Sequence, residues 1–385
     1  MATNGLRVLL LADDLTGAAD AGIAFAHRGL ATGVLLNRLP AVGAGQVVAL
    51  DLDTRDRQAG DVGEIVRLAG TQQAEVTLLK LDSMLRGHVR EALEGMLLAR
   101  PEALLVVAPA LPAMGRTTVD GAQLVDGQPT GRRLLDLLEG MPTTLLHLPA
   151  VRGDLTAALA RITTPIVVLD AETDQDLAGA ASAARQSRRA VTWAGTAGLA
   201  TAVAASMGAP RHGLPPGPAV IGPGSSVTVI GSATSAARAQ ADSLAAAGAT
   251  PISVPARELL SAPHPALAAL RRRIADAASR ADVVVSLQEP HLSGSDHELI
   301  DRLAVVVADA VGLASLLVLT GGATARAVLT SHQVERLDLR AEVEPGVVLS
   351  QAPGGDLHVI TKSGSFGDAH TLTRSVQSVR RGAQT

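Results

Sequence analysis

The sequence has no cysteine, which excludes disulfide bonds, thiol nucleophiles and zinc–thiolate sites. Aromatic residues make up only 1% of the composition, which argues against the base-stacking surfaces of nucleic-acid-binding proteins. The net charge of −4 has interspersed signs, so we expect no basic patch for nucleic acid or anionic lipid. No apolar run reaches the roughly 20 residues that a membrane-spanning helix needs, and no charged segment followed by an apolar one opens the chain. We therefore expect a soluble, cytoplasmic protein without nucleic-acid or membrane partners.

The length and the order of elements predict two domains. At 385 residues the chain exceeds the size at which a single core keeps growing. Apolar strands alternate with helical segments, which is typical of parallel α/β sheets. A proline- and glycine-rich linker over 207–225 separates domains 1–206 and 226–385. We expect an α/β fold in which each domain is a mostly parallel sheet flanked by helices, with the active site in the cleft between them. The expected strands lie near 6–11, 34–37, 47–50, 76–79, 104–108, 144–146, 166–169, 190–193, 227–230, 283–287, 316–319, 347–350 and 357–361.

The most informative segment follows the first strand. Asp13 and Asp14 come directly after the apolar run 6–11 and before an expected helix over 17–27. Two adjacent carboxylates therefore stand at the carboxyl end of a strand, where open α/β sheets bind their ligands. Thr16 can cap the helix, whose free N–H groups favour an anionic substrate. The alternative is that these residues only cap the helix.

A second group of polar residues follows the strand near 76–79. Lys80 ends this apolar strand, where burial without a partner is costly, and Asp82, Ser83 and Arg86 follow it. Together they offer donors and acceptors that suit a hydroxylated carboxylate. The alternative for Asp82 and Arg86 is an ordinary i, i+4 pair at the surface.

Two further strand ends in the first half carry arginines. Arg55 follows the strand near 47–50 and can bind a carboxylate through two hydrogen bonds. The loop 109–121 presents Arg116 after the strand near 104–108, and its two prolines restrict it. The alternative is an ordinary turn with solvated polar residues, but a fourth strand end with a polar loop in the same half favours a shared polar crevice.

Glycine-rich turns open two helices in the second half. Ser232 lies in the turn 231–235, and Gly321, Gly322 and Thr324 lie in the turn 320–325. Such turns let backbone N–H groups approach phosphate oxygens at a helix N-terminus. The segment 361–367 adds Lys362 and Gly364. Neither turn is a standard P-loop or dinucleotide fingerprint, and tight packing alone is the alternative.

These segments together resemble the four-carbon acid sugar kinase family, in the same order and at similar spacing. The family's A-D-D-x-T-G-A-x-D matches 12–20, and its K-[IL]-D-S-T-L-R-G matches 80–87, with Met84 in place of threonine. Further matches are the loop 109–121, the A-G-L-A element at 197–200, the turn at 231–232 and the P-G-V segment at 345–349, where Val348 replaces a proline. T-G-G-D-T-A matches 320–325, with Ala323 in place of aspartate, and T-K-[AS]-G-x-F-G matches 361–367.

The resemblance implies an ATP-dependent kinase with a substrate domain followed by a nucleotide domain. It implies phosphorylation of the terminal hydroxyl of a four-carbon sugar acid such as threonate, erythronate or a 3-oxo-tetronate. Phosphoryl transfer mainly needs positioning, charge neutralisation and a carboxylate at the hydroxyl. The catalytic candidates are Asp13, Asp14 and Asp82; the substrate-binding candidates are Arg55, Lys80, Ser83, Arg86 and Arg116; the ATP-binding candidates are Ser232, Gly321, Gly322, Thr324, Lys362 and Gly364.

The expected cofactors are ATP and Mg²⁺, which would bridge the phosphates, although the residue spacing identifies no metal ligands. A kinase for another small branched or 3-oxo acid stays open because of Met84. A non-catalytic sensor of a sugar acid or nucleotide stays open because of Ala323. A homodimer is compatible with the sequence, which does not determine the oligomeric state.

Overall fold

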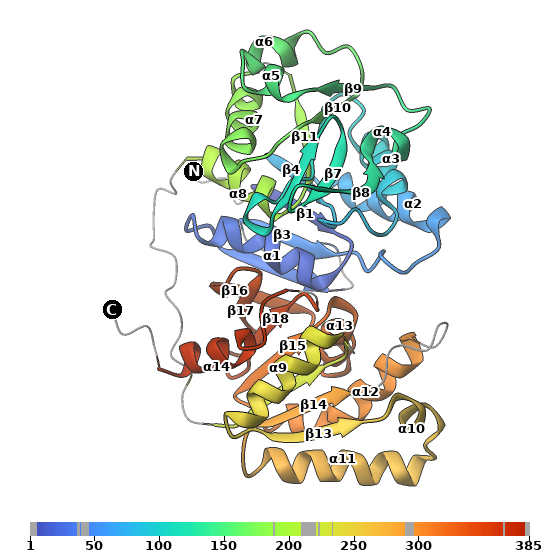
Figure 1. Cartoon of the computed structure of the whole chain (residues 1–385), viewed down its shortest axis with the longest axis vertical. Coiled ribbons are helices and arrows are strands. Elements are labelled where there is room, and N and C mark those ends of the chain that lie inside the picture. The colour runs from blue at the N-terminus through green and yellow to red at the C-terminus, as the bar shows by residue number, and fades with distance from the viewer. Residues whose placement is uncertain are drawn as a thin grey trace. The chain divides into compact units, whose positions relative to one another are not determined.

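The structure is a computed structural model that describes residues 6–36, 39, 46–187, 189–208, 221, 224–232, 234–288, 296–364 and 366–381 (Figure 1). The chain divides into two compact units, Met1–Pro215 and Pro216–Thr385, which are considered separately. Most of the expected linker 207–225 lies outside the described residues. Within the described ranges, no helix combines the length and apolar character that crossing a membrane requires.

The first unit is built on a parallel sheet. Its strand order is β2-β3-β1-β4-β11-β5-β10-β9, and every neighbouring pair in this order is parallel. Ala12 at the end of β1 pairs with Asp51 on β3 and with Lys80 on β4, so these three strands end at the same edge. The eight strands expected from the sequence all form, except that position 37 lies outside the described residues. Their bounds are β1 Val8–Ala12, β2 Thr32–Leu36, β3 Val47–Asp51, β4 Val76–Lys80, β5 Leu104–Ala108, β9 Thr143–Leu146, β10 Ile166–Leu169 and β11 Val191–Gly195.

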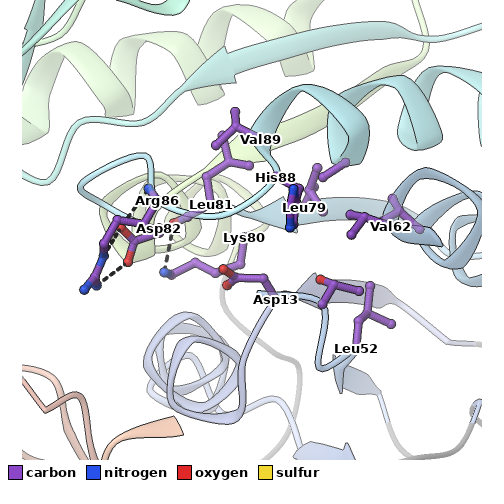
Figure 2. A pocket seen from close by; sticks show the side chains of 13 residues that line it. Asp13, Leu52, Val62, Leu79, Lys80, Leu81, Asp82, Arg86, His88 and Val89 are labelled. Carbon is purple, nitrogen blue, oxygen red and sulfur yellow. Dashed lines mark hydrogen bonds and ion pairs between the residues drawn. The ribbon is translucent and has the colours of Figure 1, made fainter. Parts of the chain in front are cut away.

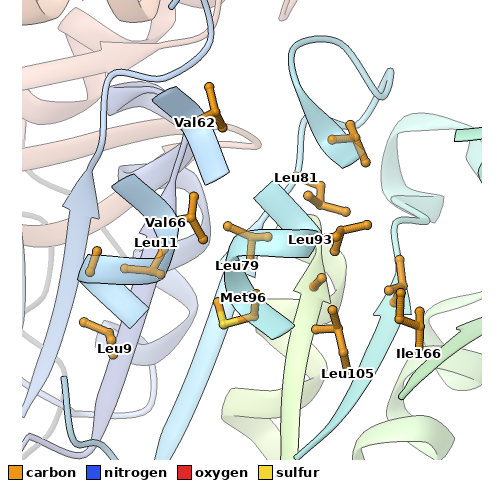
Figure 3. Close-up of a cluster of buried hydrophobic side chains, with 14 of the residues drawn as sticks. Leu9, Leu11, Val62, Val66, Leu79, Leu81, Leu93, Met96, Leu105 and Ile166 are labelled. Atoms are coloured by element: carbon orange, nitrogen blue, oxygen red, sulfur yellow. The ribbon is translucent and has the colours of Figure 1, made fainter. Parts of the chain in front are cut away.

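Helices cover both faces of this sheet. On one face, helices α2 and α3 pack together, and their apolar residues meet Leu9, Leu11 and Leu79 of the strands (Figure 3). On the other face, α1 packs against β2, β3 and α8, and α8 packs against α7. The helices are α1 Leu15–Ala26, α2 Ala59–Gly70, α3 Val89–Ala99, α4 Leu134–Leu137, α5 Leu148–Val151, α6 Leu155–Ala160, α7 Asp174–Gln186 and α8 Ala197–Ser206.

A small antiparallel sheet also belongs to the first unit. It consists of β6 (Arg116–Val119), β7 (Ala122–Val125) and β8 (Gln128–Arg133), and it follows a short 3₁₀ turn at Pro112–Met114. The polar loop expected over 109–121 does not extend through 116–119, because these residues form β6. Two tight turns, each with both central residues at positive φ, connect the three strands: Asp120–Gly121 and Asp126–Gly127.

The second unit has a mixed sheet with the strand order β13-β14-β12-β15-β18-β17-β16. The pairs from β13 to β18 are parallel, whereas β17 is antiparallel to both β16 and β18. Both units are therefore α/β with mostly parallel sheets flanked by helices. The strands are β12 Ser226–Ile230, β13 Thr250–Val254, β14 Val283–Leu287, β15 Leu316–Thr320, β16 Arg336–Glu344, β17 Val347–Gln351 and β18 His358–Lys362.

Helices α9 and α14 cover one face of this sheet, and α12 and α13 contact strands on the other. Strand β13 is not among the expected strands, and its Pro251 is tolerated because the strand lies at the sheet edge. Strand β16 is also not among them, although Leu337, Leu339 and Ala341 alternate with charged residues there. The helices are α9 Ser235–Ala246, α10 Ala256–Ser261, α11 His264–Ala278, α12 Asp296–Val311, α13 Gly322–Ser331 and α14 Thr371–Arg381.

Candidate active site

The candidate site in the first unit is a cluster of carboxylates around one arginine. Arg55, which follows β3, donates from Nε and Nη2 to the two carboxylate oxygens of Asp13, at 2.8 and 2.9 Å. Its Nη1 donates to Asp14 Oδ2, and its Nη2 lies 3.7 Å from Asp82 Oδ2. The three carboxylates follow β1 and β4, the strands whose ends share an edge with β3. The single positive charge of Arg55 thus offsets part of the repulsion among these three acids.

Asp82 is the most strongly held of these acids. Arg86 donates to its carboxylate from Nε and Nη2 at 2.9 and 2.7 Å, and the backbone N–H groups of Met84 and Arg86 donate to Oδ1. Burial alone would raise the pKa of Asp82, but its bonds to Arg86 hold that pKa well below the usual range. Asp82 is therefore an ionised anchor for its own loop at neutral pH. Burial would lower the pKa of Arg55, but the adjacent Asp14 and Asp13 carboxylates raise that pKa above its usual value.

Asp13 and Asp14 have different surroundings although they are neighbours. Asp14 is the N-cap of α1: its Oδ1 accepts from Gly17 N–H at 2.6 Å, and its Oδ2 accepts from the Thr16 hydroxyl at 3.1 Å. The expectation that Thr16 caps the helix is wrong, because α1 begins at Leu15 and includes Thr16. Burial raises the pKa of Asp13, against the pull of Arg55, and the Asp14 carboxylate adds to the rise. A carboxylate with a raised pKa is suited to exchange a proton, and Asp13 is therefore a candidate for that role.

The remaining predicted substrate residues lie on or beside the loop that follows β4. Lys80 is only 6% exposed, and its Nζ donates to the Leu81 carbonyl at 3.0 Å. Arg116 of β6 donates from Nη1 to the Ser83 hydroxyl. The Arg86 side chain is half exposed even while it is bound to Asp82. The structure therefore brings Lys80, Ser83, Arg86 and Arg116 to one loop.

A narrow pocket opens beside this cluster. Figure 2 shows the charged ends of Asp13, Lys80, Asp82 and Arg86 on one side and the apolar side chains, among them Leu79 and Val62, on the other. Its volume is about 20 Å³, which is enough for about one water molecule. This volume is much smaller than a four-carbon acid, so the pocket as it stands does not enclose such a ligand.

The predicted nucleotide residues also come together, within the second unit. Strands β12, β15 and β18 are neighbours, so the segments that follow them lie side by side. Gly321 has a φ of 90° and caps α13, and a Cβ on Gly231 would lie 1.9 Å from Thr324 Oγ1. A Cβ on Gly364 would lie 3.5 Å from that of Ser232. Only glycine accommodates the turn at Gly321 and the close approach at Gly231, and Gly364 lies beside both Ser232 and Gly321, the N-cap of α13.

Lys362, an expected ATP-binding residue, is buried at the end of β18. It is 1% exposed, and its Nζ donates to the carbonyls of Ser363 and Phe366 at 2.6 and 2.8 Å. Burial lowers the pKa of Lys362 to about 8. The ammonium thus holds the loop that carries Gly364, and a direct bond to phosphate would require it to leave these carbonyls.

The described residues contain one group of three side chains with metal-ligand chemistry, outside both clusters: Asp120, His147 and Asp170. His147 Nδ1 lies 2.8 Å from Asp120 Oδ1, and both oxygens of Asp170 already accept backbone N–H groups of the β6–β7 turn. These contacts explain the group as the anchor of a turn.

Sequence reasoning missed two residues that contact the loop after β4. Gln123 of β7 donates from Nε2 to the Ser83 carbonyl, and Arg132 of β8 donates from Nη1 to the Leu85 carbonyl at 2.8 Å. The dipeptides Asp120–Gly121 and Asp126–Gly127 are strong hairpin signals that could have revealed the strands that carry them.

Comparison with known proteins identifies a family model for each half of the chain. Residues 8–203 match the family model of a sugar-binding N-terminal domain, and residues 227–372 match that of a nucleotide-binding C-terminal domain. A D-threonate kinase of Cupriavidus necator is 37% identical, covering 96% of this chain and 97% of its own length. A D-threonate kinase of Bordetella bronchiseptica is 32% identical, covering 98% of each chain.

A solved protein of Salmonella typhimurium LT2 has the same fold, with a TM-score of 0.76 at 21% identity, covering 96% of this chain and 98% of that one. The two family models together span most of the sequence, in the order that the motifs indicate. The chain therefore belongs to the four-carbon acid sugar kinase family and is a kinase, a phosphotransferase with an alcohol group as acceptor.

Proposed function

We propose that this kinase transfers the γ-phosphoryl group of ATP to the terminal hydroxyl of a four-carbon sugar acid, with D-threonate as the first candidate. The observation that carries the proposal is the Asp13–Arg55–Asp82 cluster at the carboxyl edge of the first sheet, inside the region that matches a sugar-binding domain. Two relatives that align over almost the whole chain are named D-threonate kinases, which supports this choice of acid. Erythronate and 3-oxo-tetronate are the next candidates.

In this proposal Asp13 is the catalytic base. It accepts the proton of the substrate hydroxyl while that oxygen attacks the γ-phosphorus, the bond to ADP breaks and a phosphate ester forms. The raised pKa of Asp13 makes it a better proton acceptor than the strongly ionised Asp82. Asp14 caps α1, and its second oxygen helps to hold Arg55.

Arg55 then has a role other than the one expected from the sequence. All three of its nitrogens donate to Asp13 or Asp14, so binding a substrate carboxylate would break these bonds. We propose that Arg55 orients the base and keeps it ionised before the substrate arrives. The substrate carboxylate and hydroxyls are left to Lys80, Ser83, Arg86 and Arg116, which lie on or beside the loop after β4.

ATP is proposed to bind the second unit. The N-terminus of α13 carries no acidic residue in its first turn, so its positive potential is available to phosphate oxygens. Gly321, Gly322, Thr324, Ser232 and Gly364 surround that helix end, and Lys362 shapes the adjoining loop. Transfer requires the substrate hydroxyl and the γ-phosphate of ATP to meet during turnover.

Mg²⁺ prefers oxygen ligands and commonly uses one or two carboxylates together with substrate phosphates. The first turns of α9 and α13 offer no carboxylate. Asp13 and Asp82 offer carboxylates in the proposed sugar-acid site, but their oxygens already accept hydrogen bonds from Arg55 and Arg86, so either would hold the ion only alongside or in place of these bonds. Bound Mg²⁺ would neutralise the charge that develops on the phosphates.

An ADP-release assay over a panel of four- and five-carbon acids tests this function. We expect turnover of D-threonate with ATP, and the Asp13→Asn variant should lose about 100-fold or more in kcat, the usual scale for general-base catalysis. Best turnover of a branched or five-carbon acid would assign another substrate. Absence of turnover with every acid, in a protein that still binds one of them, would indicate a sensor.

The two lysines allow the domain roles to be tested separately. Lys80 and Lys362 are the only lysines of the chain, so ¹³C labelling of lysine side chains gives two signals, assigned with the Lys80→Met and Lys362→Met variants. D-Threonate should shift the Lys80 signal, and a non-hydrolysable ATP analogue should shift the Lys362 signal. The reverse pattern would show that the two domain roles are exchanged.

A further inference from the structure

The small sheet β6–β8 is fastened firmly to the main sheet of the first unit. Asp170, directly after β10, accepts the N–H groups of Asp120 and Gly121 at 2.8 and 2.9 Å. Thr118 and Ala171 exchange two backbone hydrogen bonds of 2.9 Å. The small sheet is thus held to the main sheet at the β6–β7 turn and along β6. It can therefore act as a rigid support for the residues that β7 and β8 contact.

Strands β7 and β8 contact the backbone of the loop that follows β4. Gln123, which is 2% exposed, donates to the Ser83 carbonyl, and Arg132 donates to the Leu85 carbonyl. Asp82 holds the opposite side of the same loop, because it accepts the N–H groups of Met84 and Arg86. The short segment 83–86 is therefore held through its carbonyls by the small sheet and through its amides by Asp82.

The conformation of this loop needs such support. Leu85 has a φ of 53°, in the left-handed region that residues other than glycine seldom adopt. Backbone of this kind persists only where the surroundings hold it in place, and it is commonly found at functional sites. Arg132 holds the carbonyl of this very residue. The next residue, Arg86, binds Asp82 and belongs to the proposed sugar-acid site.

We infer that Gln123 and Arg132 are positioning residues for sugar-acid binding: they hold the Ser83–Arg86 loop in the conformation that presents Ser83 and Arg86 to the substrate. They act through the backbone of the loop. The inference rests on the proposed function only in assigning this loop to the sugar acid. The small sheet thereby contributes to the binding of the sugar acid.

The first test measures the loop in the absence of substrate. Arg132→Met removes one donor from an exposed strand without opening the core. Amide exchange at Met84 and Arg86 should be at least several-fold faster in this variant, and Arg132→Lys, which keeps a donor, should be intermediate. Arg133→Met is the matched control, because Arg133 is the adjacent exposed arginine and donates to the Asp120 carbonyl instead. Exchange in Arg132→Met equal to that of the control overturns the inference.

The second test measures binding and turnover. The KM for the sugar acid should rise about tenfold in Arg132→Met and at least as much in Gln123→Leu, a scale set by one lost hydrogen bond to a charged or buried partner. The KM for ATP should stay unchanged. Faster exchange with an unaltered sugar-acid KM overturns the positioning role. If the wild type phosphorylates no acid, the proposed function fails, whereas the exchange experiment still decides whether the small sheet holds the loop.

Discussion

The arrangement of Arg55 among three carboxylates makes a sharp prediction about stability. In Arg55→Met, Asp13 and Asp14 lose three hydrogen bonds from the guanidinium, and Asp82 loses a charge 3.7 Å away. Removing one partner of a buried ion pair typically costs about 3–5 kcal/mol. Because the Arg55 side chain is 23% exposed, we expect the lower end, about 3 kcal/mol at pH 7.

The charge origin of this loss gives it a definite pH dependence. Arg55 lowers the pKa of Asp13 against the effect of burial, so its removal raises that pKa further. The folded variant then binds protons more tightly than the unfolded chain, and its stability deficit is largest at neutral pH and shrinks as the pH falls. The double variant Arg55→Met with Asp13→Asn should recover part of the deficit at pH 7, because one unneutralised carboxylate is gone.

The assay uses urea unfolding followed by the fluorescence of Trp193, the only tryptophan, which lies on β11 of the same unit. The matched control is Arg57→Met, because the Arg57 side chain forms an exposed pair with Asp53 and donates from Nε to the Asp53 carbonyl, and its loss should cost no more than about 1 kcal/mol. Equal stability of the two variants would refute the reasoning. A deficit that is the same at pH 5 and pH 7 would mean that packing, and not charge, is lost. A raised KM for the sugar acid in Arg55→Met, with unchanged stability, would instead indicate that Arg55 binds the substrate.

Three further predictions follow from individual residues. Asp14→Asn should lower the melting temperature by less than Asp14→Ala, because asparagine can still cap α1, and its kcat should fall less than that of Asp13→Asn. As the pH rises from about 8 to 10, the free energy of unfolding of the wild type should increase relative to that of Lys362→Met, by at most about 1.4 kcal/mol per pH unit. The reason is that Lys362 releases its proton in the folded chain but keeps it in the unfolded chain. A stability difference that does not change with pH in urea unfolding would contradict this. Ala323→Asp should change ATP affinity in calorimetry by about 1–2 kcal/mol, the scale of one charge-assisted contact, and an inactive wild type rescued by this aspartate would indicate a sensor.

The sequence predicts the edge of the sheet on which the site lies, but not the pairing of its side chains. Parallel strands end at a common edge, so residues that follow β1, β3 and β4 had to come close, and they do. The partner of Arg55 depends on distances between side chains that are 41 and 42 positions apart in the chain. Such distances cannot be read from the sequence, which therefore indicates Arg55 as a ligand of the substrate carboxylate.

The small sheet shows a different kind of failure. Its strands are short and mostly polar, so hydrophobic periodicity does not mark them, and β8 is exposed along nearly all its length. The turns that join them are nevertheless explicit in the sequence, since Asp120–Gly121 and Asp126–Gly127 both adopt the left-handed conformation that aspartate and glycine tolerate. Hydrophobic patterns thus predict the strands and helices of the core, whereas the small sheet beside the site can be predicted only from the residues that form its turns.

The chain has thirty-one arginines and two lysines, and the two lysines occupy equivalent places in the two units. Lys80 is the last residue of β4 and Lys362 the last of β18, both are nearly buried, and each donates to the carbonyl of the residue that follows it. A compact ammonium can turn back onto a carbonyl at a crowded strand end, whereas a planar guanidinium with five donors would leave some of them unsatisfied there. In each unit the loop held in this way carries the candidate ligand-binding residues, Ser83 and Arg86 in one and Gly364 in the other. The same local device therefore shapes the proposed sugar-acid and nucleotide sites.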